Sequence, residues 1–177
     1  RILHKTEESQ LWLLANNDMT IENLKNEAVK QGISDTRLVF APYVNLSEHL
    51  NRIKHADLFL DTRPYNAHTT SSDALRMGLP VLTCIGKSFS SRVAASILNS
   101  LTLTELITET EEDYESLAIE LATNPIKLTS IKDKLIHNLS SASLFDTPLF
   151  TRNLESAFKT MYEKHHNGMK PEHIYVN

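Results

Sequence analysis

The sequence has little cysteine, glycine and proline, and the scarcity of the first two excludes specific classes of protein. Of 177 residues, one is cysteine, four are glycine and six are proline. The single cysteine, Cys84, excludes a framework of intrachain disulfides, which fits a reducing compartment such as the cytoplasm. Neither G-x-x-x-x-G-K-[ST] nor G-x-G-x-x-G, the glycine-rich loops that hold nucleotide phosphates, occurs in the chain. An ordinary dinucleotide-binding Rossmann domain is therefore disfavoured.

The chain also lacks an excess of basic residues and a long apolar run. Its formal net charge is −4, so no general attraction to nucleic acid or to anionic membranes is expected. The longest apolar stretch is far too short to span a bilayer, and the start shows no signal-peptide pattern. A hydrophobic content of 41% and a mean hydropathy of −0.28 are typical of a soluble globular protein.

The length and the start of the chain bear on its domain organisation. A chain of 177 residues can form one domain with a substantial core. We find no internal repeat, low-complexity tract or linker, so residues 1–177 are expected to form a single domain. The first residue is Arg1 and not Met, which leads us to expect a piece of a longer protein.

Apolar runs alternate with helical patterns along the whole chain. The runs predict buried strands at residues 11–15, 37–43, 57–62, 80–86 and 105–109. Helical spacing and capping signals predict helices at residues 20–33, 45–56, 90–101, 110–124, 126–140 and 148–166, and another starting at His68. This alternation predicts an α/β fold, a Rossmann-like doubly wound parallel sheet with helices on both faces.

Hydroxyl groups crowd the helix that starts at His68, where the sequence reads HTTSSD. In an open α/β sheet, ligands bind at the carboxyl ends of the strands, where helix N-termini offer free N–H groups to anions. Thr69 and Thr70 would add hydroxyl donors, whereas Asp73 would repel a phosphate and should face neutral hydroxyls such as those of a ribose. The pattern fits a nucleotide diphosphate site. It fits a well-capped helix equally, because Ser, Thr and Asp are ordinary capping residues.

A second polar pair, His49 and Arg52, lies three residues apart on the helix predicted at 45–56 and therefore shares one face. This helix follows the strand that ends near Pro42, so the pair lies at the same edge of the sheet. An imidazole and a guanidinium there could stack on a base or form hydrogen bonds with it. The alternative is an ordinary solvated helix face.

Three segments resemble a known family: "RLVFAPY…SEHLNRI…ADLFLDT", "LFLDTRPYNAHTTSSDALRMGLPVLT" and "GKSFSSRVAASIL". They are similar to the C-terminal catalytic half of O-GlcNAc transferases, the SPINDLY-like and bacterial relatives in glycosyltransferase family 41. The motif D-T-x-x-x-N-x-H-T-T-x-x-D is specific, and the similarity runs from "QLWLL" to the closing "GMKPEHI". The resemblance implies a GT-B architecture, of which this chain is the C-terminal, donor-binding lobe. The first lobe and the TPR repeats of such proteins are absent from it.

The resemblance also implies roles for individual residues. The diphosphate would lie at the start of the helix, with the sugar close by and the ribose and uracil beyond. The implied contacts are His68, Thr69 and Thr70 for the diphosphate, His68 and Tyr65 for the sugar, Asp73 for the ribose, and His49, Arg52 and the backbone around Tyr43 and Val44 for the uracil.

Two departures from the family are visible. Leu46 stands where animal O-GlcNAc transferases have a lysine that helps hold the ribose, and the family's phosphate-neutralising lysine belongs to an upstream segment. We assign no general base in this chain. The isolated chain is expected to bind UDP weakly and to show no transferase turnover.

The implied reaction is transfer of GlcNAc from UDP-GlcNAc to a Ser or Thr of a protein acceptor, with inversion at the anomeric carbon. No metal or other cofactor is expected, because the chain has no DxD-type pair and His165, His166 and His173 fit no standard metal motif. Three alternatives stay open: transfer of glucose from UDP-glucose to Asn, transfer of fucose from GDP-fucose, and a non-catalytic module. Apolar faces on the last helices would be exposed without the first lobe, and self-association is compatible with that.

Overall fold

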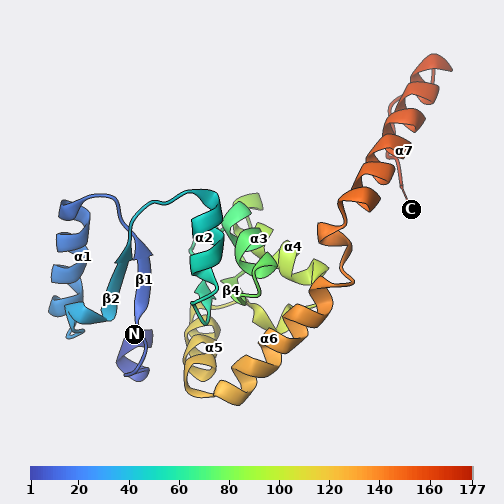
Figure 1. Ribbon diagram of the computed structural model, residues 1–177. Coiled ribbons are helices and arrows are strands. Elements are labelled where there is room, and N and C mark those ends of the chain that lie inside the picture. The colour runs from blue at the N-terminus through green and yellow to red at the C-terminus, as the bar shows by residue number, and fades with distance from the viewer. Residues whose placement is uncertain (177) are drawn as a thin grey trace.

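The computed structural model describes residues 1–176, in which parallel strands alternate with helices (Figure 1). The strands are β1 (Leu11–Leu14), β2 (Leu38–Ala41), β3 (Phe59–Leu60), β4 (Val81–Cys84) and β5 (Ile107–Thr108). The helices are α1 (Asp18–Lys30), α2 (Leu46–Ile53), α3 (Thr69–Arg76), α4 (Val93–Ser100), α5 (Glu111–Thr123), α6 (Pro125–Leu139) and α7 (Thr147–His166). Each strand and helix expected from the sequence is present, with ends that differ by a few residues.

The strands pair in parallel, which confirms the predicted α/β class. They form two sheets, however, and not one: β1 pairs with β2, while β3, β4 and β5 form a second sheet in that order. The chain leaves the first sheet at β2, passes through α2 and enters the second sheet at β3 (Figure 1). Among residues 1–176, no backbone ladder joins β1 to β3, so the two sheets are separate.

The hydrophobic core lies around β4, the central strand of the second sheet. All four residues of β4 are buried, as expected for a strand covered on both faces. Helices α3, α4 and α5 pack against it. Cys84 is part of this strand and is buried in the core. The largest fully buried side chains include Leu75, Leu82, Leu98, Leu101, Leu103, Leu106, Leu121 and Leu135.

Helix α7 extends away from the rest of the molecule (Figure 1). It starts with a cap, because the side chain of Asp146 accepts a hydrogen bond from the Leu149 amide at 2.9 Å. Phe150, Leu154, Phe158 and Met161 are exposed on it, as expected from its amphipathic pattern. No helix in residues 1–176 is both long enough and apolar enough to cross a membrane.

The packing around β4 predicts a large effect for one substitution. Leu98→Ala should lower the free energy of unfolding by about 2–5 kcal/mol, because Leu98 is completely buried and its truncation leaves a cavity. Leu154→Ala, on the exposed face of α7, should change it by less than about 0.5 kcal/mol. Urea unfolding of both variants measures the difference. Equal effects would contradict the placement of the core.

Candidate functional site

The side chain of Asp61 organises the loop that follows β3. It is only 6% exposed, and its carboxylate accepts three hydrogen bonds. Oδ1 accepts from the amides of Thr62 at 2.8 Å and Ala67 at 2.6 Å, while Oδ2 accepts from Thr83 Oγ1 at 2.6 Å. Residues 61–67 are thereby closed into a ring around one carboxylate, and that ring is tied to β4.

Further contacts hold the same loop from other elements. The hydroxyl of Tyr114, on α5, donates to the backbone oxygen of Asp61 at 2.9 Å. Asn66 is buried. Its Nδ2 donates to the Thr62 oxygen at 2.8 Å, and its amide donates to the Ser90 oxygen at 3.0 Å. The position of His68 and the start of α3 is therefore fixed by β4, by α5 and by the segment around Ser90.

Burial governs the electrostatics of this ring. It raises the pKa of Asp61 above the usual value of 3.8, although the hydrogen bonds from Thr83, Ala67 and Thr62 and the nearby His68 act in the opposite direction. Burial, reinforced by the negative charge of Asp61, also raises the pKa of Tyr114. Tyr114 therefore keeps its proton and remains a hydrogen-bond donor to the loop.

Helix α3 starts without a side-chain cap. His68 is its N-cap residue and makes no capping hydrogen bond. Within residues 1–176, the side chains of Thr69, Thr70 and Asp73 form no hydrogen bond, and the amides of the first turn have no partner within the helix. In α2, by contrast, the Asn45 side chain accepts from the Glu48 amide at 3.0 Å. The capping interpretation of HTTSSD is therefore wrong, and the hydroxyls of Thr69 and Thr70 remain available.

Two aromatic rings flank His68. The ring of Tyr65 stacks on it with centroids 4.9 Å apart, and Phe89 approaches edge-on with centroids 6.1 Å apart. Nε2 of His68 lies 3.4 Å from the Ser90 oxygen. Because a carbonyl only accepts, the proton of the neutral imidazole belongs on Nε2 in this contact, which leaves Nδ1 as an acceptor.

A hollow of about 570 Å³ lies in front of these groups. It is lined by Phe59, Thr62, Tyr65, Asn66, Ala67, His68, Thr69 and Thr70. The structure thus brings together four of the residues singled out from the sequence: Tyr65, His68, Thr69 and Thr70. The volume of this hollow is in the range of small-molecule sites. Asp73, half-buried, lies one turn further along α3, outside the lining.

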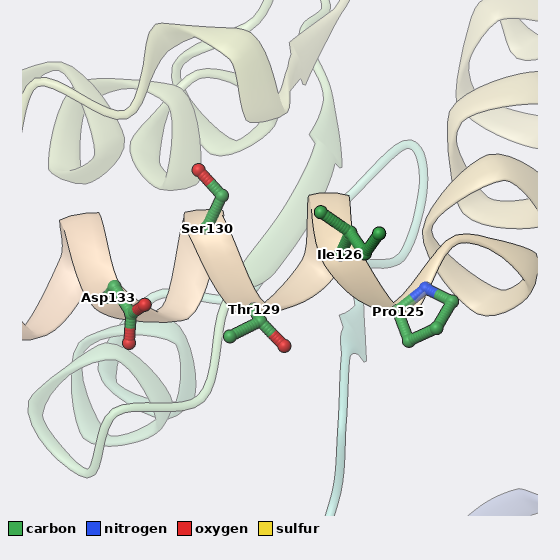
Figure 2. A pocket seen from close by; sticks show the side chains of 5 residues that line it. All are labelled: Pro125, Ile126, Thr129, Ser130 and Asp133. Atoms are coloured by element: carbon green, nitrogen blue, oxygen red, sulfur yellow. The ribbon is translucent and has the colours of Figure 1, made fainter.

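A second hollow, of about 500 Å³, is formed by side chains along α6 alone (Figure 2). It is lined by Pro125, Ile126, Thr129, Ser130 and Asp133. None of these residues was singled out from the sequence.

The residues predicted to contact the base lie on and before α2, which packs beside α3. Nη1 of Arg52 donates to the Pro42 oxygen at 2.6 Å, and Nη2 lies 3.3 Å from Nδ1 of His49. The Arg52 guanidinium also lies 6.0 Å from the centre of the Trp12 ring, on β1. Arg52 can only donate, so Nδ1 of His49 accepts and Nε2 carries its proton.

Tyr43 and Val44 lie between β2 and α2, where Tyr43 is 77% exposed and Val44 is half-buried. Like His49 and Arg52, they are outside the lining of the 570 Å³ hollow. The base-side residues therefore form a second group, next to the first through the packing of α2 on α3.

Among the residues to which the sequence analysis gave no role, Asp61 and Phe89 shape the site, although Asp61 is the first residue of the motif D-T-x-x-x-N-x-H-T-T-x-x-D. The signal for Asp61 was its position directly after the apolar run "LFL". A carboxylate at the end of a buried strand must itself be buried with hydrogen-bond partners or must contact a ligand. Phe89 is 81% exposed in a Ser-rich turn, and nothing in its local sequence indicates a contact with His68.

Comparisons with known proteins agree with one another. The sequence model of Glycosyl transferase family 41 matches residues 1–154. A Caenorhabditis elegans UDP-N-acetylglucosamine–peptide N-acetylglucosaminyltransferase is 33% identical over 100% of this chain and 15% of its own length. A probable enzyme of the same name, SEC, from Arabidopsis thaliana is 33% identical over 99% of this chain and 18% of its own length. A solved mutant of Thermobaculum terrenum O-GlcNAc transferase superposes with a TM-score of 0.83 at 31% identity, over 91% of this chain and 32% of that one. This chain thus spans less than a fifth of the two curated relatives.

The raised pKa of Asp61 predicts a pH dependence. A group whose pKa is raised on folding contributes most to stability below its unfolded value, here 3.8, and loses that contribution as the pH rises through the raised value. Asp61→Asn removes the titration but keeps an oxygen that can accept from the amides of Thr62 and Ala67. The wild-type protein should therefore lose stability relative to Asp61→Asn as the pH rises above 3.8 and through the raised pKa of Asp61, as measured by urea unfolding. A difference that stays constant or changes in the opposite direction would contradict the burial of this carboxyl.

Proposed function

Because the chain belongs to glycosyl transferase family 41, we propose that it is the donor-binding lobe of a protein O-GlcNAc transferase of GT-B architecture. The full protein would transfer GlcNAc from UDP-GlcNAc to Ser or Thr of its acceptors, with inversion. The names of the worm and plant relatives and of the bacterial structure support this activity. Acceptor proteins would be bound by the first lobe and TPR repeats, outside this chain.

The uncapped start of α3 carries the proposal. A helix start of this kind offers unpaired N–H groups and the positive end of the helix dipole to an anion. Thr69 and Thr70 add two hydroxyl donors that line the hollow. When the bond between the anomeric carbon and the β-phosphate oxygen breaks, negative charge grows on the β-phosphate. Donors already held in place by the Asp61 ring would stabilise that charge.

The neighbouring residues would hold the other parts of the donor. Tyr65 and His68 line the hollow beside Thr69 and are assigned to the sugar. Asp73 lies about one helical turn, roughly 5.4 Å, beyond the phosphate donors, so its carboxylate is kept off the phosphates and can accept from ribose hydroxyls.

His49 is assigned to stacking on the uracil, with the backbone around Tyr43 and Val44 at the uracil edge. Arg52 is assigned a different role from the one expected. Its contacts with the Pro42 oxygen and with His49 Nδ1 support a role in positioning the His49 ring.

The proposal involves neither a metal nor another cofactor, because N–H and hydroxyl donors take the place of a cation at the phosphates. The buried, unpaired Cys84 supports a reducing compartment such as the cytoplasm. Transfer from UDP-glucose or GDP-fucose is not favoured, since the relatives described above are named for UDP-GlcNAc. A competition titration with the three nucleotide sugars distinguishes these donors.

The donor site predicts the behaviour of two variants in a calorimetric titration with UDP. Asp73→Ala and the double variant Thr69→Ala/Thr70→Ala should each lose about 1–3 kcal/mol of binding free energy, or roughly 5- to 150-fold in affinity. The matched control is Thr129→Ala/Ser130→Ala, in the hollow on α6, which should bind as the wild type does. Addition of EDTA should leave the affinity unchanged. Equal losses in the control variant, or none in the site variants, would exclude this placement of the donor.

The departure at Leu46 predicts a gain. Leu46 is exposed at the first position of α2, where the resemblance to the family implies a lysine that helps hold the ribose. Leu46→Lys should therefore raise UDP affinity several-fold at low ionic strength and less at high salt, because an exposed charge is screened. Leu46→Gln, similar in length but uncharged, is the control. The same gain in both variants, or none with lysine, would show that this position does not contact the donor.

A further inference from the structure

The imidazole of His68 is held by three neighbours. Its Nε2 lies 3.4 Å from the Ser90 oxygen. The ring of Tyr65 stacks on it with 19° between the ring planes, and Phe89 meets it edge-on at 87°. The Ser90 oxygen is itself fixed, because it accepts a hydrogen bond from the Asn66 amide at 3.0 Å. Turning the ring over would move Nε2 away from that oxygen, so the two ring nitrogens keep different roles.

The nitrogen that is left for a ligand is Nδ1. Among residues 1–176 it has no hydrogen-bond partner, and in the neutral ring it can only accept. His68 lines the hollow beside Thr69 and Thr70, where the diphosphate is proposed to bind. The ionised oxygens of a diphosphate also only accept. A contact between Nδ1 and a phosphate oxygen would therefore bring two lone pairs together unless a proton lies between them.

The place of His68 in the fold opposes that proton as long as no anion is bound. His68 is the N-cap residue of α3. The free N–H groups of the first turn and the helix dipole give a helix start a partial positive charge, which repels a cation. A bound diphosphate brings negative charge on both of its phosphates. The local field at His68 then changes sign and attracts a cation.

Two neighbours lower the cost of a positive charge on His68. Tyr65 presents the face of its ring at a centroid distance of 4.9 Å, and a cation over an aromatic face is stabilised. The buried carboxylate of Asp61 interacts electrostatically with His68. These neighbours favour the charged ring and the helix start opposes it, so a bound anion decides the balance.

The other charged or titratable side chains around His68 come from the elements packed about it. They are Arg63 in the same loop, Lys87 and Arg92 in the segment of Ser90, Asp73 on α3, His49 and Arg52 on α2, and Tyr114 on α5. Arg63 pairs with Glu111 at 2.9 Å, and Arg92 donates to the Gly86 oxygen at 3.1 Å. Within residues 1–176, the lining of the hollow contains no Lys or Arg, so His68 is its one side chain that can become a cation.

We propose that His68 takes up a proton when the diphosphate of the donor binds, and that the resulting imidazolium is the cation that faces the phosphates in this lobe. Its Nδ1–H would donate to a phosphate oxygen while Nε2–H keeps the Ser90 contact. The proton comes from the solvent and returns to it when the nucleotide leaves. This inference rests on the proposed donor site and adds a charge to it, since the backbone N–H groups and the hydroxyls of Thr69 and Thr70 are neutral.

The charge has a consequence for the reaction. As the bond to the anomeric carbon breaks, negative charge grows on the β-phosphate, and a hydrogen bond from a cation stabilises it more than one from a neutral donor. It also makes donor binding depend on pH. Binding is strongest where His68 is protonated and weakens as the pH rises through the range in which histidines lose their proton, about pH 5–8.

Calorimetric titration with UDP-GlcNAc in buffers of different ionisation enthalpy counts the protons taken up. UDP-GlcNAc is the probe because both of its phosphates are esterified, whereas the terminal phosphate of UDP itself titrates at about pH 6. We expect uptake of about half a proton or more per bound nucleotide at about pH 7, and an affinity that falls by up to about tenfold per pH unit above it. In protein labelled with ¹⁵N-histidine, both ring nitrogens of His68 should carry a proton in the complex.

Two matched variants identify the group that takes up the proton. His68→Gln keeps an amide N–H that can reach the Ser90 oxygen but cannot titrate, so it should bind more weakly and without proton uptake. His49→Gln removes the histidine on α2, whose Nδ1 lies 3.3 Å from the Arg52 guanidinium and is therefore kept unprotonated. This variant should keep the proton uptake of the wild type, even where its affinity is lower.

The outcomes separate this inference from the proposed function. Binding without proton uptake, or uptake that persists in His68→Gln, would overturn the inference and leave the donor site in place. Uptake that is lost in His49→Gln alone would move the proton to the base side and overturn the inference as well. If UDP-GlcNAc does not bind at any pH between about 6 and 8, the donor site and the inference both fail.

Discussion

The buried carboxylate of Asp61 is the group on which the geometry of the candidate site depends. Removing a charge from water is unfavourable, and the raised pKa of Asp61 expresses that cost. Three hydrogen bonds offset it, from the amides of Thr62 and Ala67 and from the hydroxyl of Thr83. Because these donors come from both ends of one loop and from the next strand, the carboxylate fixes where the loop begins and where it returns.

That fixed loop explains why α3 can remain uncapped. In α1, α2, α5, α6 and α7, the side chain of the N-cap residue accepts a hydrogen bond from the first turn. Helix α4 lacks such a bond but continues directly from a 3₁₀ turn at Phe89–Ser91. Helix α3 is the exception that opens onto a hollow. The unsatisfied donors are thus concentrated beside Thr69 and Thr70, where an anionic ligand would satisfy them.

Much of this arrangement could be predicted from local sequence, because apolar runs and capping signals are local. The strand before Asp61 and the helix that starts with the hydroxyls of Thr69 and Thr70 follow from that order of residues, whereas Tyr65 was placed beside them only by the resemblance to the family. The contacts between distant residues could not be predicted. Arg52 lies over the ring of Trp12, 40 residues earlier in the chain, and Tyr114 donates to the backbone oxygen of Asp61, 53 residues earlier. The sequence around each of these residues does not indicate its partner. The division into two sheets was missed for the same reason, since strand pairing is decided by neighbours far along the chain.

The most direct test is a nuclear magnetic resonance titration of the ¹⁵N-labelled chain with UDP. If the start of α3 binds the diphosphate, the amide signals of Thr69, Thr70 and Ser71 should shift most, since their N–H groups would gain a charged acceptor. Signals from residues 125–133, around the hollow on α6, should stay in place. Largest shifts in residues 125–133, or a saturating titration that leaves Thr69–Ser71 unmoved, would contradict the assignment of this helix start to the donor.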